Sequence, residues 1–157
     1  MSPITSETFS RRFPELASSL DSAQIAALLE ACEVHDAQAG EALVAEGTPS
    51  SDLFLVCDGE LDVTMKGPAG ERVLARLGPS SCFGEVSLLD PGPAGASVVT
   101  EQGCVALRLS RERFDGLRRS DPAVAAPLLR EVLRSLAARL RAARTHVEGL
   151  QEGGAVA

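Results

Sequence analysis

The residues of this chain best suited to bind a ligand are Gly84 and Glu85, within the run Phe-Gly-Glu-Val-Ser-Leu-Leu at positions 83–89. A glycine lets the backbone approach an anionic group closely, and successive backbone N–H groups can then surround it. The Glu85 carboxylate can accept a hydrogen bond from a hydroxyl group. A second run of small residues at 93–99, Pro-Ala-Gly-Ala-Ser-Val-Val, follows after three residues. Together the two runs, here called the cassette (residues 83–99), predict a site for a phosphate that lies beside a hydroxyl.

The predicted ligand contacts of the cassette are one carboxylate and seven small or apolar residues. They are Gly84, Glu85, Val86, Ser87, Ala94, Gly95, Ala96 and Ser97. Phe83, which precedes them, is expected in the core. Glu85 has a second interpretation, in which its charge caps the N-terminus of a short helix.

The remaining residues give little support to catalysis or to a metal site. Metal chemistry in a β-roll needs several histidines and a carboxylate on neighbouring strands. The two histidines, His35 and His146, are expected on helices instead. No serine or cysteine has a recognisable histidine base beside it. Cys82 suggests a haem ligand, although burial explains it equally well. The chain is therefore predicted to be no enzyme and to hold no metal.

Cysteine usage and hydropathy indicate a cytoplasmic protein. The four cysteines are widely separated and form no C-x-x-C motif, so they are expected to be reduced thiols. The N-terminus lacks a signal peptide, and no apolar run reaches the length of a membrane span.

Charge is distributed unevenly along the 157 residues. Positions 1–110 carry 6 basic and 16 acidic side chains, whereas positions 111–145 carry nine arginines and four acids. An acidic body does not favour broad binding to DNA, which requires a positive surface. The chain also lacks Trp and Tyr, so stacking platforms for single-stranded nucleic acid are not expected. We therefore expect no direct contact with nucleic acid.

Hydrophobic periodicity divides the chain into three parts within one domain. Helical spacing occupies residues 9–34, with Asp21 as the N-cap of a second helix. Short alternating runs punctuated by glycine fill residues 40–109 and predict an antiparallel β-roll, with a tight hairpin at Asp58-Gly59. Residues 110–150 return to helical spacing. Residues 1–8 and 151–157 are predicted to be a flexible N-terminus and a disordered tail.

The last helix carries a heptad pattern. Asp121 and Pro122 are typical of a helix start. Apolar residues then recur at alternating spacings of three and four, which is the a/d pattern of a coiled coil. The seam is defined by Ala126, Leu129, Leu133, Leu136, Leu140, Ala143, Val147 and Leu150. Its first part, around residues 128–133, is expected to pack on the roll. The rest has no body to cover, which favours a homodimer or another protein partner.

Taken together, the helical lead-in, the glycine-punctuated strands, the Phe-Gly-Glu run and the long last helix resemble the cyclic-nucleotide-binding domain family. The resemblance covers about residues 9–145 and implies an α+β fold around an antiparallel β-roll. In the family, the cassette glutamate binds the ribose 2′-hydroxyl, an arginine pairs with the cyclic phosphate, and the last helix closes over the base. Aligned without gaps, the chain has Ala94 at the arginine position.

Loss of that arginine decides what the resemblance implies about function. Removing one partner of a buried charge pair costs about 2–5 kcal/mol, which is roughly 30-fold to several-thousand-fold in affinity. The expectation is a regulatory and interaction module with lost or weakened nucleotide binding, and at most weak binding of cAMP or cGMP. The alternative is a working cAMP or cGMP sensor, with the phosphate met by Arg72, Arg76 or an arginine of the last helix. Full transcription regulators of the family carry a helix-turn-helix after the long helix, whereas this sequence stops at Ala157, so direct operator binding is not expected.

Overall fold

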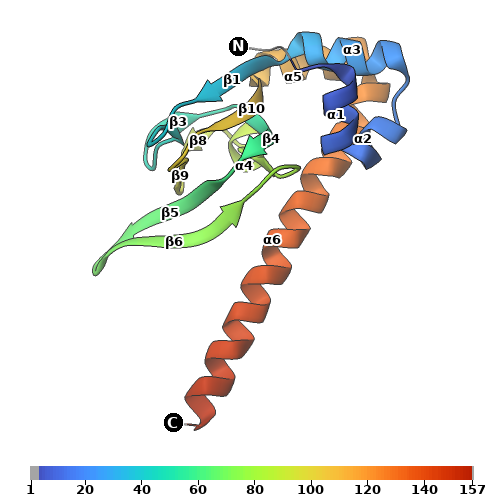
Figure 1. Cartoon of the computed structure of the whole chain (residues 1–157). Coiled ribbons are helices and arrows are strands. Elements are labelled where there is room, and N and C mark those ends of the chain that lie inside the picture. Colours follow the sequence, from blue (N-terminus) through green and yellow to red (C-terminus); the bar gives the residue numbers. More distant parts are fainter. Residues whose placement is uncertain (1–3, 157) are drawn as a thin grey trace.

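The computed structural model describes residues 4–156, with side chains described for residues 4–145 and 149. Its helices are α1 (Ser6–Arg12), α2 (Pro14–Ser18), α3 (Ser22–Ala31), α4 (Glu85–Leu89), α5 (Arg111–Ser120) and α6 (Pro122–Val156). Its strands are β1 (Glu33–Ala37), β2 (Ala42–Val44), β3 (Pro49–Ser50), β4 (Leu53–Gly59), β5 (Leu61–Gly67), β6 (Gly70–Leu77), β7 (Cys82–Phe83), β8 (Gly92–Pro93), β9 (Ser97–Val99) and β10 (Cys104–Leu109). Figure 1 shows the roll at one end, with α6 extending far from it.

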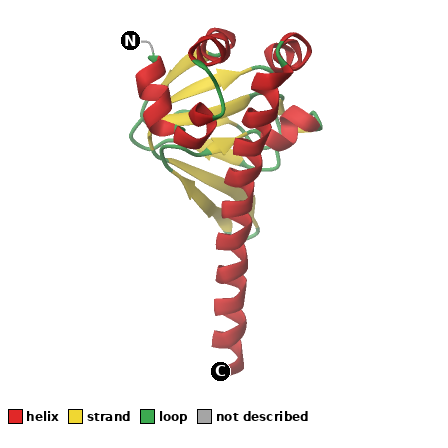
Figure 2. Cartoon of the chain, turned by 90° about the vertical axis from the view of Figure 1, so that its right-hand side faces the viewer, coloured by secondary structure: helices red, strands yellow, loops and turns green. Residues whose placement is uncertain are grey.

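Two four-stranded sheets form the roll. One has the order β1-β10-β4-β7 and the other β2-β9-β5-β6, while β3 pairs with β8 alone. Every strand pairing is antiparallel. Helices α1, α2, α3 and α5 gather at the end of the roll where α6 begins (Figure 2). The predicted α+β roll with N-terminal helices and a long C-terminal helix is confirmed.

Strand β4 separates two hydrophobic cores because successive side chains of a strand point to opposite faces. Leu53, Leu55 and Cys57 face a core shared with the helices. Phe54 and Val56 face the interior of the roll. All five are buried, so β4 is covered on both faces. This central strand also pairs with β7, which leads directly into the cassette.

Helix starts follow the sequence closely. The Asp21 carboxylate accepts from Gln24 N at 2.8 Å, and the Gln24 side chain accepts from Asp21 N at 2.9 Å, which completes a capping box. Ser110 caps α5 through a bond from Arg113 N. Helix α6 starts at Pro122. Local capping chemistry alone therefore locates these boundaries.

The end of the N-terminal helices differs from the prediction. Residues 33 and 34 were expected to continue a helix, but α3 ends at Ala31 and β1 follows it. The strand forms because β10 offers an edge with which β1 pairs over five residues. His35 therefore lies on a strand of the roll, and its predicted helical position is wrong. His146 lies outside the described side chains.

The predicted hairpin at Asp58-Gly59 is also wrong. Strand β4 pairs with β10 and β7, whereas β5 pairs with β6 and β9, so the chain passes from one sheet to the other at this point. Gly59 has φ +85°, and a Cβ there would lie 2.5 Å from the Gly103 carbonyl oxygen. The glycine marks a close crossing against β10 rather than a turn between paired strands.

Both ends of the chain show more helix than the sequence predicts. Helix α1 begins at Ser6 with Thr5 as its N-cap, within the predicted flexible segment 1–8. Helix α6 continues to Val156, past the point where the tail 151–157 was predicted to lose order. No helix among the described residues has the length and apolar character needed to cross a membrane. The proposed domain boundaries themselves stay a prediction.

Candidate functional site

Gly84 opens the cassette in a conformation that only glycine adopts easily. Its φ is +91°, and it serves as the N-cap of α4 without a side-chain cap. A Cβ at this position would lie 2.1 Å from the Asp52 carbonyl oxygen. The backbone just before β4 therefore approaches the cassette so closely that a side chain at position 84 would clash. This requirement exists whether or not a ligand binds.

The residues around Gly84 anchor the cassette to the roll. Phe83 is buried and stacks on Phe54, with ring centroids 4.8 Å apart and an interplanar angle of 8°. Leu88, on α4, is buried against the helices. The prediction that Phe83 belongs to the core is confirmed. Phe83 packs on one face of β4 and Leu88 packs in the core on the other face, and together they fix the position of α4.

Glu85 is buried and pairs with an arginine of α6. Its side chain is 6% exposed, and Arg139 Nη2 donates to Glu85 Oε1 at 2.6 Å. No side-chain cap bond occurs at the start of α4, but Glu85 lies in its first turn, where the helix dipole favours a carboxylate, so the capping interpretation stays a prediction. The carboxylate that the resemblance assigns to a ribose hydroxyl is instead engaged by this chain's own last helix.

One further polar atom on each side chain of the Glu85–Arg139 pair makes no hydrogen bond. Glu85 Oε2 and Arg139 Nε are both buried without a hydrogen-bond partner. Nε and Nη2 occupy one edge of the planar guanidinium group, which matches the two oxygens of a carboxylate. The pair as it stands makes one charge-assisted hydrogen bond and leaves these two atoms unpaired.

The second run of the cassette offers no positive charge. Ala94 is buried, and its backbone N–H donates to Thr48 O while its C=O accepts from Gly47 N, both at 2.8 Å. The Ser97 hydroxyl accepts from Glu46 N at 2.9 Å. These bonds fix the run to the loop between β2 and β3. The named polar groups of this run are thus engaged in hydrogen bonds within the roll.

The eight predicted contact residues differ in exposure. Glu85 and Ala94 are buried, Val86 and Gly95 are exposed, and the other four are half-buried. Their ligand contacts stay a prediction. Arg72 lies on β6, and Arg76 pairs with Asp62 at 3.3 Å, so neither approaches Glu85 as Arg139 does.

Sequence reasoning considered an arginine of the last helix without choosing one, and Arg139 is the residue it missed. A signal was present. In a helix, residues three, four, seven and eleven positions apart lie on one side. Arg139 follows Leu128, Val132 and Ser135 at such spacings, and Leu128 and Val132 are buried against the body. The side of α6 that faces the roll therefore includes position 139.

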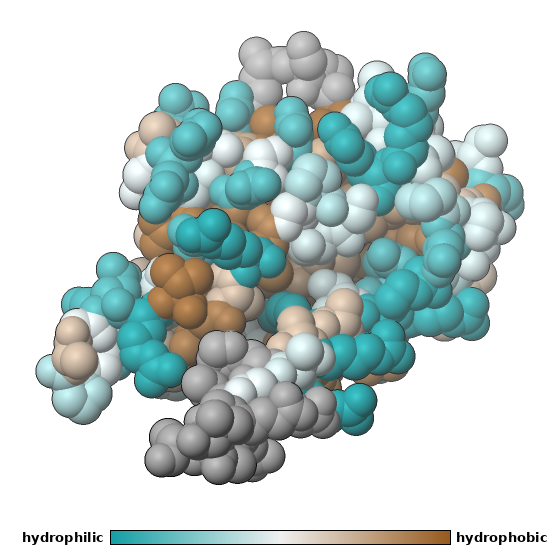
Figure 3. Space-filling view, turned by 60° about the horizontal axis from the view of Figure 1, so that its bottom comes forward, coloured by the Kyte–Doolittle hydropathy of each residue, from teal (hydrophilic) through white to brown (hydrophobic). Residues whose placement is uncertain are grey.

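A groove lies between β6 and α6. It has a volume of about 960 Å³, and its floor includes Val73 and Leu74 on the strand and Ala138 and Ala142 on the helix. Val73 and Leu74 remain about half exposed. Figure 3 shows hydrophobic side chains at the surface on this side of the molecule. Glu85 and Ala94 do not line the groove, although Arg139 does.

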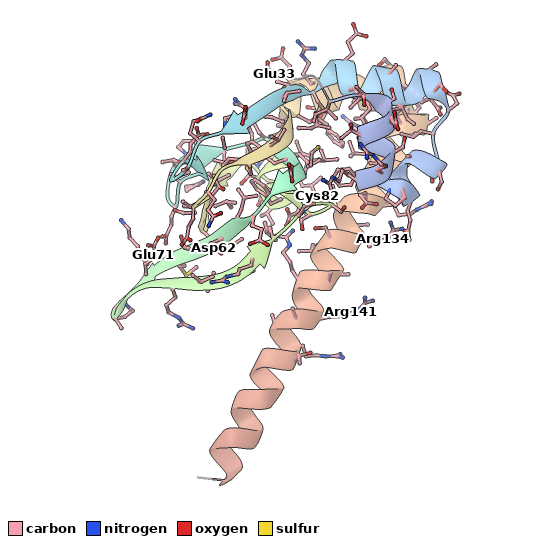
Figure 4. The ribbon with its side chains drawn as sticks, viewed as in Figure 1. Glu33, Asp62, Glu71, Cys82, Arg134 and Arg141 are labelled. Carbon is pink, nitrogen blue, oxygen red and sulfur yellow. The ribbon has the colours of Figure 1, made fainter. Side chains whose placement is uncertain are left out.

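Two further contacts fasten the start of α6. The Ser135 hydroxyl donates to Cys82 O and accepts from Cys82 N, both at 3.1 Å, and so completes the free edge of β7. Arg134 pairs with Glu15 on α2 and with Glu131 at 2.9 Å. In Figure 4, Cys82 lies close to α6, whereas Arg141 points away from the roll. These polar contacts add to the burial of Val124, Leu128 and Val132 in holding α6 to the body.

Glu131 is a buried carboxylate within this attachment. Burial raises its pKa above the ordinary value of 4.5, while the Arg134 guanidinium acts in the opposite direction. The pair with Arg134 links α6 to α2 through Glu15. Burial outweighs this pairing, so the charge on Glu131 is net unfavourable in the folded chain.

The predicted seam of α6 is partly separate from the side that packs on the body. Leu128 and Val132 are buried, as expected, and Leu129 and Leu136 are half-buried. Leu133 and Leu140 are both 63% exposed, so the expectation that Leu133 packs on the roll is wrong. Ala143 is exposed, and Val147 and Leu150 lie outside the described side chains. The reason is geometric, since residues 132 and 133 differ by about 100° around a helix.

Histidine and cysteine show no catalytic or metal-binding arrangement among the described residues. His35 Nε2 lies 2.5 Å from Glu41 Oε2, and this bond lowers the pKa of Glu41. Burial raises the pKa of Cys32 to about 12 and that of Cys57 to about 11. No group of three or more His, Cys, Asp or Glu in the described part of the chain is placed to hold a metal ion.

Comparison with known proteins assigns the family. The model of the cyclic nucleotide-binding domain matches residues 34–121, more than half of the chain. The chain therefore belongs to the cyclic nucleotide-binding domain family, as the resemblance suggested. It is 33% identical over 113 residues to a CRP-like cAMP-activated global transcriptional regulator of Mycobacterium tuberculosis, covering 71% of this chain and 50% of the regulator.

Solved structures agree on the fold. A cyclic nucleotide-binding domain from Methylobacillus flagellatus covers 92% of this chain and 84% of its own, with a TM-score of 0.82 and 23% identity. The catabolite activator protein of Thermus thermophilus covers 87% of this chain and 63% of its own, with a TM-score of 0.69 and 33% identity. The chain spans half the length of the mycobacterial regulator, so activities of such whole proteins are not carried over.

Proposed function

We propose that this chain is a non-enzymatic regulatory module whose cyclic nucleotide binding is lost or weakened, and which acts in the cytoplasm through protein contacts of α6. The observation that carries the proposal is the state of Glu85, which is buried and paired with Arg139 of α6. The contact that a ligand hydroxyl would make is thus already made within the chain. The same contact joins the roll to α6.

The missing charge at position 94 supports the same conclusion. A buried phosphate needs a partner, because an unpaired buried charge is costly. Ala94 provides a methyl group at the arginine position of the family, and its backbone groups are used by Gly47 and Thr48. The expected loss in affinity is about 2–5 kcal/mol, or roughly 30-fold to several-thousand-fold. The acidic body further disfavours an anion.

Calorimetric titration with cAMP, cGMP and a cyclic dinucleotide tests the loss of binding. We expect no binding in the micromolar range for any of them. Micromolar affinity for cAMP or cGMP would refute the proposal. Visible absorption of the purified protein tests the separate haem hypothesis, which predicts an absorption band that we do not expect.

The second candidate is a working cAMP or cGMP sensor with non-standard phosphate recognition. It is favoured by the guanidinium group of Arg139, which lies at the cassette and could turn from Glu85 to a phosphate. The two candidates differ in the effect of Arg139→Met. A sensor that uses Arg139 would bind cAMP in the wild type and lose it in the variant, whereas the degenerate cassette binds cAMP in neither.

The proposed protein contact is self-association through the seam of α6. Leu133 and Leu140 are exposed on a side of the helix that the body does not cover. Identical heptad seams pair readily because knobs of one helix fit holes of the other. Light scattering should give a dimer at micromolar concentration, and Leu133→Glu with Leu140→Glu should give a monomer. A wild-type monomer at high micromolar concentration would contradict this part.

Nucleic acid stays outside the proposal. The mycobacterial regulator is named as a cAMP-activated transcriptional regulator, and this chain matches half of it. The expectation that the present chain makes no direct contact with nucleic acid therefore remains a prediction. A gel-shift assay with mixed duplex DNA at low salt would test it, since electrostatic binding is strongest there.

A further inference from the structure

We propose that an arginine stripe on α6 is the docking surface for an acidic α-helix of a partner protein. The stripe is defined as Arg130, Arg134, Arg141 and Arg144. All four side chains are exposed. The inference rests on the proposed role of α6 in protein contacts, and it adds the chemistry of a partner. It does not require the chain to self-associate.

The stripe follows a side of α6 that is turned away from the body. Successive residues of a helix are rotated by about 100°, so the four arginines fall within an arc of about 80°. Arg139, whose guanidinium group pairs with Glu85, lies roughly 180° from Arg130. Arg141 points away from the roll in Figure 4. The stripe extends along α6 for about 20 Å.

Positive charge along the stripe is only partly balanced. Residues 122–145 contain five arginines and one acid, Glu131, which is buried. Arg134 pairs with Glu131 and with Glu15 of α2. No hydrogen bond or ion pair within the described part of the chain engages Arg130 or Arg141. The planar guanidinium groups of these two residues are therefore open to carboxylates, whose paired oxygens they match.

A narrow rod fits the stripe better than a flat surface does. Helix α2 flanks the first part of the stripe, because its Glu15 pairs with Arg134. A furrow between the two helices includes Arg130 and Arg134 in its lining. Further along, the side chain between Arg134 and Arg141 on this side is that of Ala137. Small residues let two helices approach to about 8–10 Å, so a partner helix can lie along α6 beside α2.

Two other anionic partners fit the stripe less well. A helix that binds a membrane surface buries large apolar side chains among the lipids, whereas Ala137 offers a methyl group and Leu133 and Leu140 lie in the seam to one side. Nucleic acid would also meet the body, where 6 basic and 16 acidic side chains over positions 1–110 give a net charge of −10. A short acidic helix brings its carboxylates to α6 without reaching the body's full charge.

NMR titration of the isotopically labelled whole chain with a helical peptide of about 20 residues tests the proposal. The peptide carries four glutamates at the spacings of the arginines, which are four, seven and three residues. A peptide of the same composition in scrambled order is the reference. The matched peptide should bind more tightly and should shift amide signals of α6 between residues 130 and 144. Added salt should weaken the binding, because the charges involved are exposed.

Two double variants assign the surface that binds the peptide. Arg130→Gln with Arg141→Gln removes guanidinium groups that make no bond within the described residues, so the fold should be kept. Affinity for the matched peptide should fall by about fivefold to tenfold. The matched control, Arg72→Gln with Arg76→Gln, removes two exposed arginines of β6 and the same amount of charge. It should change the affinity by less than about twofold.

The outcomes separate this proposal from self-association. Leu133→Ser with Leu140→Ser alters the seam without adding charge, and this variant should still bind the matched peptide. Binding that is lost there but kept in Arg130→Gln with Arg141→Gln would assign the peptide to the seam and overturn the stripe. Equal affinity for the matched and scrambled peptides would overturn it too. Tighter binding of anionic lipid vesicles or mixed duplex DNA, lost with Arg130 and Arg141, would refute the acidic helix as the partner.

Discussion

The two runs of the cassette differ in what the rest of the fold demands of them. In the first run, Gly84 is fixed by the Asp52 carbonyl, Phe83 by stacking, and Glu85 by Arg139. In the second run, Ala94 is held through its backbone alone. The first run matches the family pattern and the second departs from it. A cassette glycine and glutamate can thus persist for structural reasons, so their presence does not demonstrate ligand binding.

The largest expected effect is a gain of binding in the second run. Ala94→Arg restores the guanidinium group that would neutralise a phosphate. Affinity for cAMP should rise by roughly 30-fold to several-thousand-fold, measured by calorimetry. Ala94→Gln, which is long but uncharged, is the matched control and should give no comparable gain. If Ala94→Arg folds but gains no affinity for cAMP, the space for a nucleotide at the cassette is closed.

The second effect tests the structural demand on the first run. Gly84→Ala should lower the free energy of unfolding by about 2–4 kcal/mol, because its Cβ meets the Asp52 carbonyl oxygen at a positive φ. Gly95→Ala, where a Cβ meets nothing within 4 Å, should change it by less than about 0.5 kcal/mol. Urea denaturation measures both. Equal effects would erase the proposed difference between the runs.

A third effect concerns the pair between Glu85 and α6. Arg139→Met leaves a buried carboxylate unpaired and should cost about 2 kcal/mol of unfolding free energy. Adding Glu85→Leu should recover most of this loss, because both charges are then removed. Arg141→Met, on the exposed side of α6, is the control and should be close to neutral. If the double variant stays as unstable as the single one, the pair does not explain why Glu85 is retained.

The smallest effect is a pH dependence at the start of α6. Burial raises the pKa of Glu131 in the folded chain above its ordinary value of 4.5. The folded state therefore holds this proton more tightly than the unfolded state, and the resulting stability is lost as the pH rises through the raised pKa. Glu131→Gln removes that loss, so its stability relative to the wild type should increase from pH 4.5 upwards. Chemical denaturation of both proteins over a series of pH values measures the trend.

Much of the fold was predictable because it follows from local chemistry. Capping residues such as Asp21 and Ser110, glycines at turns and alternating strands indicated the helices and the roll. The failures share one cause. Strand β1 exists because β10 provides an edge, and Gly59 changes sheets because β10 crosses close to it. Neither event leaves a signal in the neighbouring residues.

The candidate site divides in the same way. Sequence alone determined the cassette, the alanine in place of the arginine, and the heptad repeat of the last helix, because residue type and spacing are local properties. Only the tertiary structure decided that Arg139 meets Glu85 and that Leu133 faces away from the body. Those outcomes depend on where α6 crosses the roll and on its rotation about its own axis. Packing of distant segments sets both, and no short stretch of sequence encodes them.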